Sequence, residues 1–142
     1  MAAKEYICKR TFIGRIPHGS DLLNSLTEFV REKGIKLGRL QMIGAVEKAV
    51  AGLYDSEAEK YENFVFDKPM EVLSLIGNVS LKDGQPFIHA HITLGDEKGQ
   101  SFGGHLMEGT IVFAAEFIIE EFEGEDLERI FDKTTGLALW DI

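Results

Sequence analysis

The sequence contains very little cysteine and no apolar run long enough to cross a membrane. Its only cysteine, Cys8, cannot form a disulfide within the chain, which fits a reducing, cytoplasmic setting. Because Cys8 lies in an alternating segment, we expect a buried apolar side chain rather than a nucleophile. The longest apolar run, 111–117, is interrupted by Glu116 and is far shorter than the ~20 residues of a membrane helix. No secretory leader opens the chain, so we do not expect a secretory precursor, and the short apolar runs predict no membrane partner.

Linker segments and an excess of positive charge are missing as well. The 142 residues include no proline-rich or serine-rich stretch, so we expect one domain, residues 1–142. The formal net charge is −9, and a field of that sign repels a phosphate backbone. The grouped basic residues, Lys9-Arg10 and those at 31, 33, 36 and 39, are expected to be solvated. Nucleic acid is therefore not the expected partner of this chain alone.

One helical segment lies near the start of the chain. Ser20 is a suitable N-cap, Asp21 falls in the first turn, and Gly34 is placed to end the helix. Between them, apolar residues recur at helical spacing on one face: Leu22, Leu26, Phe29 and Val30. The pattern predicts an amphipathic helix that packs against the rest of the fold.

Most of the remaining sequence has the alternation and the turn residues of β-strands. Residues 6–13 predict a first strand, and glycines between residues 35 and 55 predict short strands broken by bends or bulges. Residues 61–66 predict a short strand, and the runs 71–81, 86–95, 101–107 and 110–121 predict a meander of antiparallel hairpins. An extended tail is expected to follow, with an ambiguous segment at 127–131 and a run at 137–140. Together these elements predict an α+β fold, an antiparallel-rich β-sheet with one main N-terminal helix packed on it.

Three of the four histidines lie close together, at positions 89, 91 and 105. Residues two apart on a strand point to the same face, so His89 and His91 would project side by side. If the next turn is centred on Lys98, His91 lies opposite His105, at a Cβ separation of roughly 4.5–5.5 Å. The glycines at 103 and 104 predict a bulge, a bend or a close backbone approach that aims His105. Three imidazoles with a fourth position left to water are typical of a catalytic zinc site.

Spacing alone leaves other interpretations open. Histidines two apart also occur by chance, as ordinary polar residues of a strand. Glu108 could accept a hydrogen bond from a ligand histidine or act as a general base, or it could be a charge at a strand end. His18 could join the site or belong to a loop. Four further residues could line a pocket, or serve the surface and packing: Arg15, Tyr54, Lys60 and Tyr61.

Several motifs, spread over nearly the whole chain, resemble those of the plant and prokaryote conserved (PPC) domain family. They are Gly14-Arg15-Ile16-Pro17, Gly19 to Leu23 at the helix start, Ile43 to Val46, Glu71 to Val79, His89-Ala90-His91 and Gly103 to Thr110. None of these motifs is specific by itself, but the set is specific when taken together.

The resemblance implies a compact α+β domain that assembles as a homotrimer and, in prokaryotic members, a metal site at His89, His91 and His105. The DNA-binding description of the family comes from plant members that add an AT-hook, an Arg-Gly-Arg-Pro segment for the minor groove. This sequence has no such segment, which agrees with its acidic charge. The apolar runs 112–115 and 117–119 suit a subunit contact, or a strand buried on both faces within one subunit.

Three kinds of function follow from these patterns. The first is a metal-binding trimer that holds zinc or another divalent transition metal and could act on a small molecule. The second is a regulatory module that binds DNA or another protein through the assembled trimer. The third is a scaffold whose only activity is oligomerisation. No Walker loop, dinucleotide-binding glycine motif or nucleophile elbow offers a different chemistry.

Overall fold

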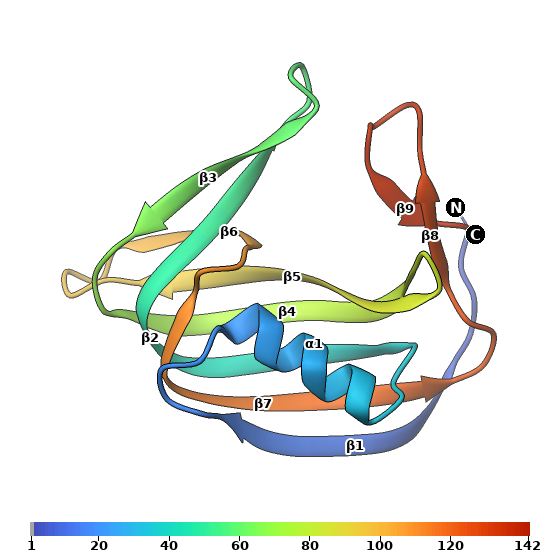
Figure 1. Cartoon of the computed structure of the whole chain (residues 1–142), viewed down its shortest axis with the longest axis horizontal. Coiled ribbons are helices and arrows are strands. Elements are labelled where there is room, and N and C mark those ends of the chain that lie inside the picture. The colour runs from blue at the N-terminus through green and yellow to red at the C-terminus, as the bar shows by residue number, and fades with distance from the viewer. Residues whose placement is uncertain (1) are drawn as a thin grey trace.

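A nine-stranded sheet carries a single helix on one face in the computed structural model, which describes residues 2–142 (Figure 1). The elements are β1 (Ile7–Ile16), α1 (Leu22–Glu32), β2 (Gly38–Asp55), β3 (Lys60–Phe66), β4 (Met70–Lys82), β5 (Gln85–Gly95), β6 (Ser101–Leu106), β7 (Ile111–Glu123), β8 (Glu128–Phe131) and β9 (Ala138–Trp140). The expected α+β fold, antiparallel-rich with one N-terminal helix, is confirmed. Within these residues, α1 is the only helix, and it is too short to cross a bilayer.

Strand β2 organises the sheet because it pairs with four other strands. Its first half lies between β7 and β4, and its second half pairs with β3 and touches β6 at Ala51 and Gly52. Since β4 also pairs with β5, and β5 with β6, these strands close a ring through β2. The expectation of several short strands between residues 35 and 55 was wrong, because this segment is one long strand. Its register shifts, one of them next to Gly44, agree with the bulges that were the other expectation.

The meander is shorter than the sequence predicted. Strands β4, β5 and β6 form the expected antiparallel hairpins, but β7 pairs with β1 and β2 instead of β6. The turn after β6 directs the chain away from β6, and Thr110 holds this turn in place. The buried Thr110 hydroxyl accepts from the Val50 N–H at 3.0 Å and lies 3.2 Å from the carbonyl oxygens of Val50 and Met107.

Helix α1 starts one residue later than its sequence suggested. Asp21 is the N-cap, and its side chain accepts a hydrogen bond of 2.9 Å from the Asn24 N–H. Ser20 is therefore not the cap, because its hydroxyl donates to the Pro17 carbonyl at 2.6 Å instead. Gly34 follows the helix with a φ of 65°, a conformation that suits glycine, so the predicted end is confirmed.

The main core lies between α1 and the sheet. Its most deeply buried side chains come from the apolar face of the helix and from alternating strand positions: Leu22, Leu26, Val30, Leu40, Leu75, Ile92, Leu94 and Ile119. Cys8 is exposed, so the expectation of a core cysteine was wrong. It lies on β1, an edge strand on which only Ile16 is buried.

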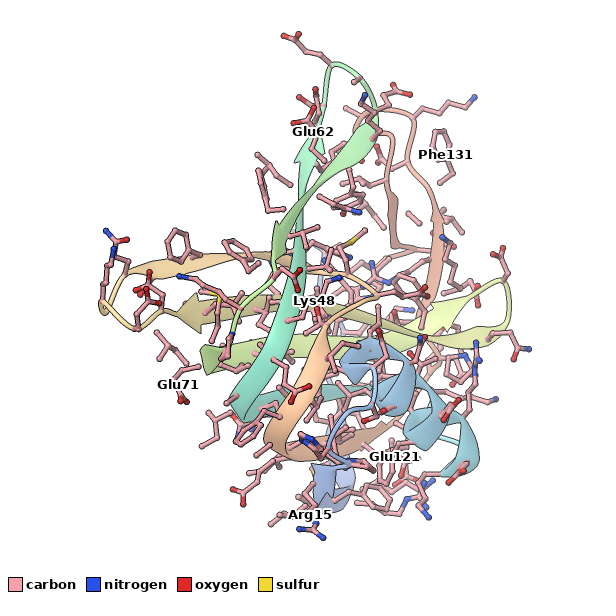
Figure 2. The ribbon with its side chains drawn as sticks, turned by 60° about the vertical axis from the view of Figure 1, so that its left-hand side comes forward. Arg15, Lys48, Glu62, Glu71, Glu121 and Phe131 are labelled. Carbon is pink, nitrogen blue, oxygen red and sulfur yellow. The ribbon has the colours of Figure 1, made fainter. Side chains whose placement is uncertain are left out.

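Two hairpins stand away from the sheet on the same side of it. One is formed by the far half of β2 with β3, and the other by β8 with β9 (Figure 1). Figure 2, a view turned from the first, shows Glu62 on one and Phe131 on the other. The second hairpin is attached by a short parallel pairing of Leu81 with Glu128. Strands β5 and β6 pass below these hairpins.

Candidate metal centre

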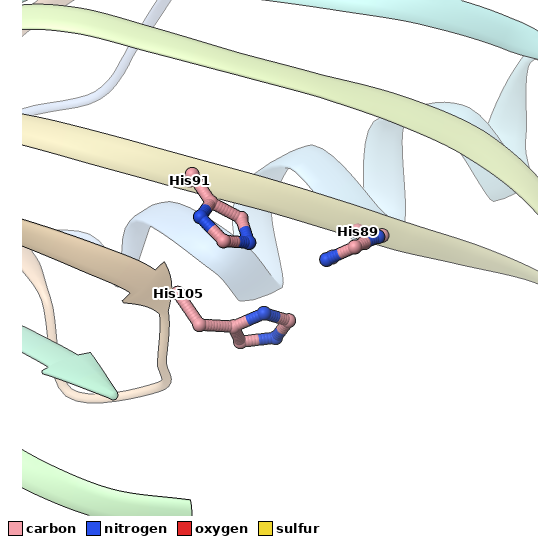
Figure 3. A group of neighbouring side chains, drawn as sticks. All are labelled: His89, His91 and His105. Carbon is pink, nitrogen blue, oxygen red and sulfur yellow. The ribbon is translucent and has the colours of Figure 1, made fainter. Parts of the chain in front are cut away.

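The three clustered histidines converge at the junction of β5 and β6. His91 on β5 lies directly opposite His105 on β6, so the register assumed from the sequence is confirmed. One ring nitrogen from each of His89, His91 and His105 lies within 4.8 Å of the others, and the rings turn toward a common point (Figure 3). The spacing along one strand and the pairing between two strands therefore bring together all three side chains.

Backbone packing on both sides of β6 holds His105 in place. A Cβ added to Gly104 would lie 2.7 Å from the Gly52 carbonyl oxygen, and one added to Gly103 would lie 2.5 Å from that of Ile92. Side chains at these positions would push β6 away from β2 or β5. The two glycines therefore serve a close backbone approach, one of the three roles expected for them.

The environment keeps the half-buried imidazoles neutral. Burial lowers the pKa of His105 to about 4, helped by the nearby His89, His91 and Arg129. Burial also lowers the pKa of His89, with further contributions from Arg129 and His91. Neutral imidazole is the form that binds metal ions. His91 is exposed, so the group opens to solvent on one side.

Arg129 on β8 is the residue beside the histidines that sequence patterns did not reveal. Its guanidinium donates to the Ser80 hydroxyl at 2.8 Å, the Asn78 side-chain oxygen at 2.8 Å and the Ala138 carbonyl at 3.0 Å. It also lies 3.5 Å from Nδ1 of His89. Arg129 belongs to the segment that was ambiguous in sequence, and its contact partners come from β4, β5 and β9, so no local signal could have identified it.

A cavity of about 320 Å³ adjoins the histidines and lies between the two hairpins. It is lined by Tyr54, Glu59, Lys60, Tyr61, Lys82, Phe87, His89, His105, Arg129 and residues 136–139. Three of the four residues proposed from sequence as pocket or surface groups are thus part of this lining, namely Tyr54, Lys60 and Tyr61. Arg15 lies apart from it, at the far end of the molecule from the hairpins (Figure 2).

The remaining residues considered from sequence lie elsewhere. His18 has its Nδ1 at 3.0 Å from the Phe113 carbonyl oxygen and its Nε2 at 3.8 Å from Glu47, and it is not one of the three clustered histidines. Glu108 is exposed on the turn after β6 and does not line the cavity. Its role as an acceptor or general base stays a prediction, and this position favours the simpler interpretation of a charge at a strand end.

The three histidines fit a transition-metal ion. In a tetrahedral site with metal–nitrogen distances of about 2.0–2.1 Å, the ligand nitrogens are roughly 3.4 Å apart. The separations of up to 4.8 Å between these nitrogens need only small side-chain rotations to reach that value. In addition, Nδ1 of His105 is buried and has no hydrogen-bond partner within residues 2–142. A buried nitrogen without a partner is unfavourable, and a metal ion could satisfy it.

Comparison with known proteins gives both family and structural relatives. The model of the Plants and Prokaryotes Conserved (PCC) domain matches residues 3–123. The crystal structure of a metal-containing protein from Archaeoglobus fulgidus is 44% identical, covers 99% of each chain and has a TM-score of 0.93. That of a PPC protein from Pyrococcus horikoshii is 41% identical, covers 100% of this chain and 98% of the other, and has a TM-score of 0.94.

More distant relatives have other descriptions. A Bacteroides thetaiotaomicron protein described as a DNA-binding candidate is 29% identical, with a TM-score of 0.86 and 96% of each chain covered. The curated relatives are two bifunctional GlmU proteins from Synechococcus strains. For one of them the match is 28% identical and covers 89% of this chain but 20% of the relative. The chain therefore spans about a fifth of the length of the curated relatives it matches.

Proposed function

The chain belongs to the Plants and Prokaryotes Conserved domain family, and on that premise we propose that it binds zinc or another divalent transition metal through His89, His91 and His105. The convergence of three imidazoles with nitrogens within 4.8 Å of one another is the observation that carries the proposal. The relative from Archaeoglobus fulgidus, 44% identical, is described as metal-containing. Imidazole nitrogen is a preferred ligand of zinc and its neighbours in the transition series.

The chain's own residues would prepare this site in two ways. Burial and the nearby Arg129 keep His89 and His105 neutral, so little proton release would oppose binding near neutral pH. Strand pairing fixes the positions of all three histidines. An ion bound there supplies Lewis acidity beside the cavity of about 320 Å³, which has room for a small molecule.

Removing one histidine tests the metal site. We expect purified wild-type protein to contain about one metal ion per chain and His91→Ala to lose it, because two remaining imidazoles bind far more weakly than three. His91 is exposed, so its loss should leave the fold intact, which circular dichroism checks. His18→Ala is the matched control, because His18 lies outside the cluster. Elemental analysis that finds no metal in wild-type protein from metal-replete medium contradicts the proposal, as does equal metal content in the two variants.

We also propose that the chain assembles as a homotrimer, as its family resemblance implies. The sheet face opposite α1 carries exposed apolar side chains: Ile13, Ile43, Leu73, Ile76 and Phe113. Strand β7 contributes to both sides, since Val112, Ala115, Phe117 and Ile119 are buried in the core while Phe113 is 57% exposed. Large exposed apolar patches of this kind are typical of subunit contacts.

The charges of this chain give little support for DNA binding, although its Bacteroides relative is described as a DNA-binding candidate. Four of the six basic residues that could have formed a patch are paired with carboxylates: Lys9 and Arg10 with Glu121, Lys36 with Asp126, and Arg39 with Glu120. These pairs cancel much of the local positive charge, and the net charge is −9. The phosphate attraction that dominates DNA affinity is therefore weak on this surface.

A further inference from the structure

Arg129 is a buried cation without a carboxylate partner. Its residue is 8% exposed, and its three good hydrogen bonds go to the neutral acceptors Ser80, Asn78 and Ala138. No acidic group of residues 2–142 forms an ion pair with it. An isolated buried charge is unfavourable unless an opposite charge joins it. An anion bound beside the guanidinium would therefore stabilise it.

The cavity next to Arg129 is positive although the chain as a whole is acidic. Its lining includes the cations Arg129, Lys60 and Lys82, and only one carboxylate, that of Glu59. Lys60 and Lys82 are exposed, while Arg129 lies deeper, with its guanidinium over the rings of Phe87 and Trp140. In a chain with a net charge of −9, such a concentration of positive charge favours anions in the cavity.

The Tyr54 hydroxyl in the cavity lining lacks a hydrogen-bond partner within the described part of the chain. The hydroxyl of Tyr54 is buried and forms no hydrogen bond with any of residues 2–142. It lies where the two hairpins meet, since a Cβ added to Gly136 on the β8–β9 hairpin would be 2.5 Å from it. A buried hydroxyl without a partner costs free energy that a bound acceptor would restore.

We propose that this cavity binds a small organic anion through Arg129 and Tyr54, with the rest of the molecule directed toward the three histidines. The volume of about 320 Å³ is at the small end of the range for ligand pockets, so the ligand is a small molecule. Phe87, Leu137 and Leu139 give the lining apolar surface for a carbon skeleton. The approach to a metal ion rests on the proposed function, whereas the contact with Arg129 does not.

Benzoate and benzamide provide a matched pair of probes, because they have nearly the same shape and differ in charge. We expect benzoate to bind the metal-loaded protein saturably in calorimetric titration, and benzamide to bind at least about tenfold more weakly, the ratio expected for a charge-assisted hydrogen bond. Inorganic phosphate is a third probe. If it competes with benzoate, the site accepts both anions. Equal affinity for benzoate and benzamide overturns the proposal.

Two substitutions then locate the binding site. Arg129→Gln should weaken benzoate binding by about tenfold or more, since it removes the charge. Because Arg129 also connects β8 to β4, this variant could fold poorly, so Tyr54→Phe is the second test. It should weaken benzoate binding several-fold and, by removing an unpaired buried hydroxyl, raise the melting temperature of the free protein. A purely structural role for Tyr54 predicts the opposite shift in melting temperature.

Arg39→Gln is the control, because Arg39 is an exposed arginine paired with Glu120 outside the cavity lining. Benzoate binding that stays at the wild-type level in both the Arg129 and Tyr54 variants contradicts the anion site. Elemental analysis of every sample separates this result from a failure of the metal proposal. Metal-free wild type that still binds benzoate through Arg129 supports the anion site alone, and metal-loaded protein with Arg129-independent binding supports the metal site alone.

Discussion

The surroundings of His105 lower its pKa more than those of His89 lower the pKa of that residue. Its imidazole stacks against that of His89 with ring centroids 5.0 Å apart, and it lies 4.7 Å from the ring of Tyr61. Burial removes much of the water that would stabilise a positive charge on the ring, and charge repulsion from His89, His91 and Arg129 adds to this effect. The pKa of His105 is therefore about 4, well below the ordinary value of 6.5.

This shift predicts that the metal-free protein loses stability as the pH falls from about 6.5 toward 4. In that window the unfolded chain takes up a proton that the folded chain refuses, so protonation favours unfolding. The contribution is fully present above the unfolded pKa and is lost below it. Urea unfolding at a series of pH values measures the effect. His105→Phe should have a shallower pH dependence than wild type and His18→Phe, and the same dependence in all three proteins rules out this origin.

The residues of the site differ in how far the sequence could predict them. His89 and His91 were placed on one face by strand alternation, and His105 by counting residues across one short turn. Those relations are local, so a pattern in the sequence contains them. Arg129 is 40 positions from His89, and its β8 strand reaches the site through a parallel pairing with β4. Neither the burial of Arg129 nor its partners could be inferred from its neighbours in sequence.

At the scale of elements, Asp21 connects the helix to the turn that follows β6. One carboxylate oxygen caps α1 through the Asn24 N–H, and the other accepts a hydrogen bond of 2.6 Å from the Gly109 N–H. Asp21 also forms a β-bridge with Ile111 at the start of β7. A single side chain therefore fixes both the start of the helix and the departure of the chain from β6.

Replacement of Asp21 should consequently destabilise the fold more than loss of an ordinary cap. We expect Asp21→Ala to lower the free energy of unfolding by about 1–3 kcal/mol, since it removes two hydrogen bonds to backbone donors. Ser20→Ala is the matched control, and it should change stability by less than about 0.5 kcal/mol because it removes only one solvent-exposed hydrogen bond, from the Ser20 hydroxyl to the Pro17 carbonyl. Urea denaturation of the three proteins measures the difference. Equal losses in both variants contradict the assignment of Asp21 as the cap.

Glycines explain why the helix was predicted more accurately than strand β2. The helix was recognised because its apolar spacing is regular over three turns. In β2, Gly38 and Gly44 were interpreted as bends or bulges that break the strand, but the strand continues through both, and each allows a neighbouring backbone to approach. A Cβ on Gly38 would lie 2.4 Å from the Glu120 carbonyl oxygen, and one on Gly44 would lie 2.2 Å from that of Ala114. A glycine that ends a strand and a glycine that permits close packing look the same in sequence.

For the molecule as a whole, contacts between distant segments create the site. The ring closed by β2, β4, β5 and β6 aligns the histidines, and the β8–β9 hairpin brings Arg129 above them. Because β1 and β9 belong to one sheet, we propose that residues 1–142 form a single domain. We also propose a reducing, cytoplasmic setting, because an exposed free cysteine such as Cys8 is open to intermolecular disulfide formation in an oxidising one.

The apolar sheet face predicts how the chain's assembly can be disrupted. Ile76 is 67% exposed, next to the fully buried Leu75 on β4, so it points away from the core. We expect wild-type protein to sediment with three times the chain mass and Ile76→Lys to sediment as a monomer, because a subunit contact would bury the new charge without a partner. Val65→Lys, at a 58% exposed apolar position on β3, should remain trimeric. A monomeric wild type refutes the trimer, and a trimeric Ile76→Lys would move the contact away from this face.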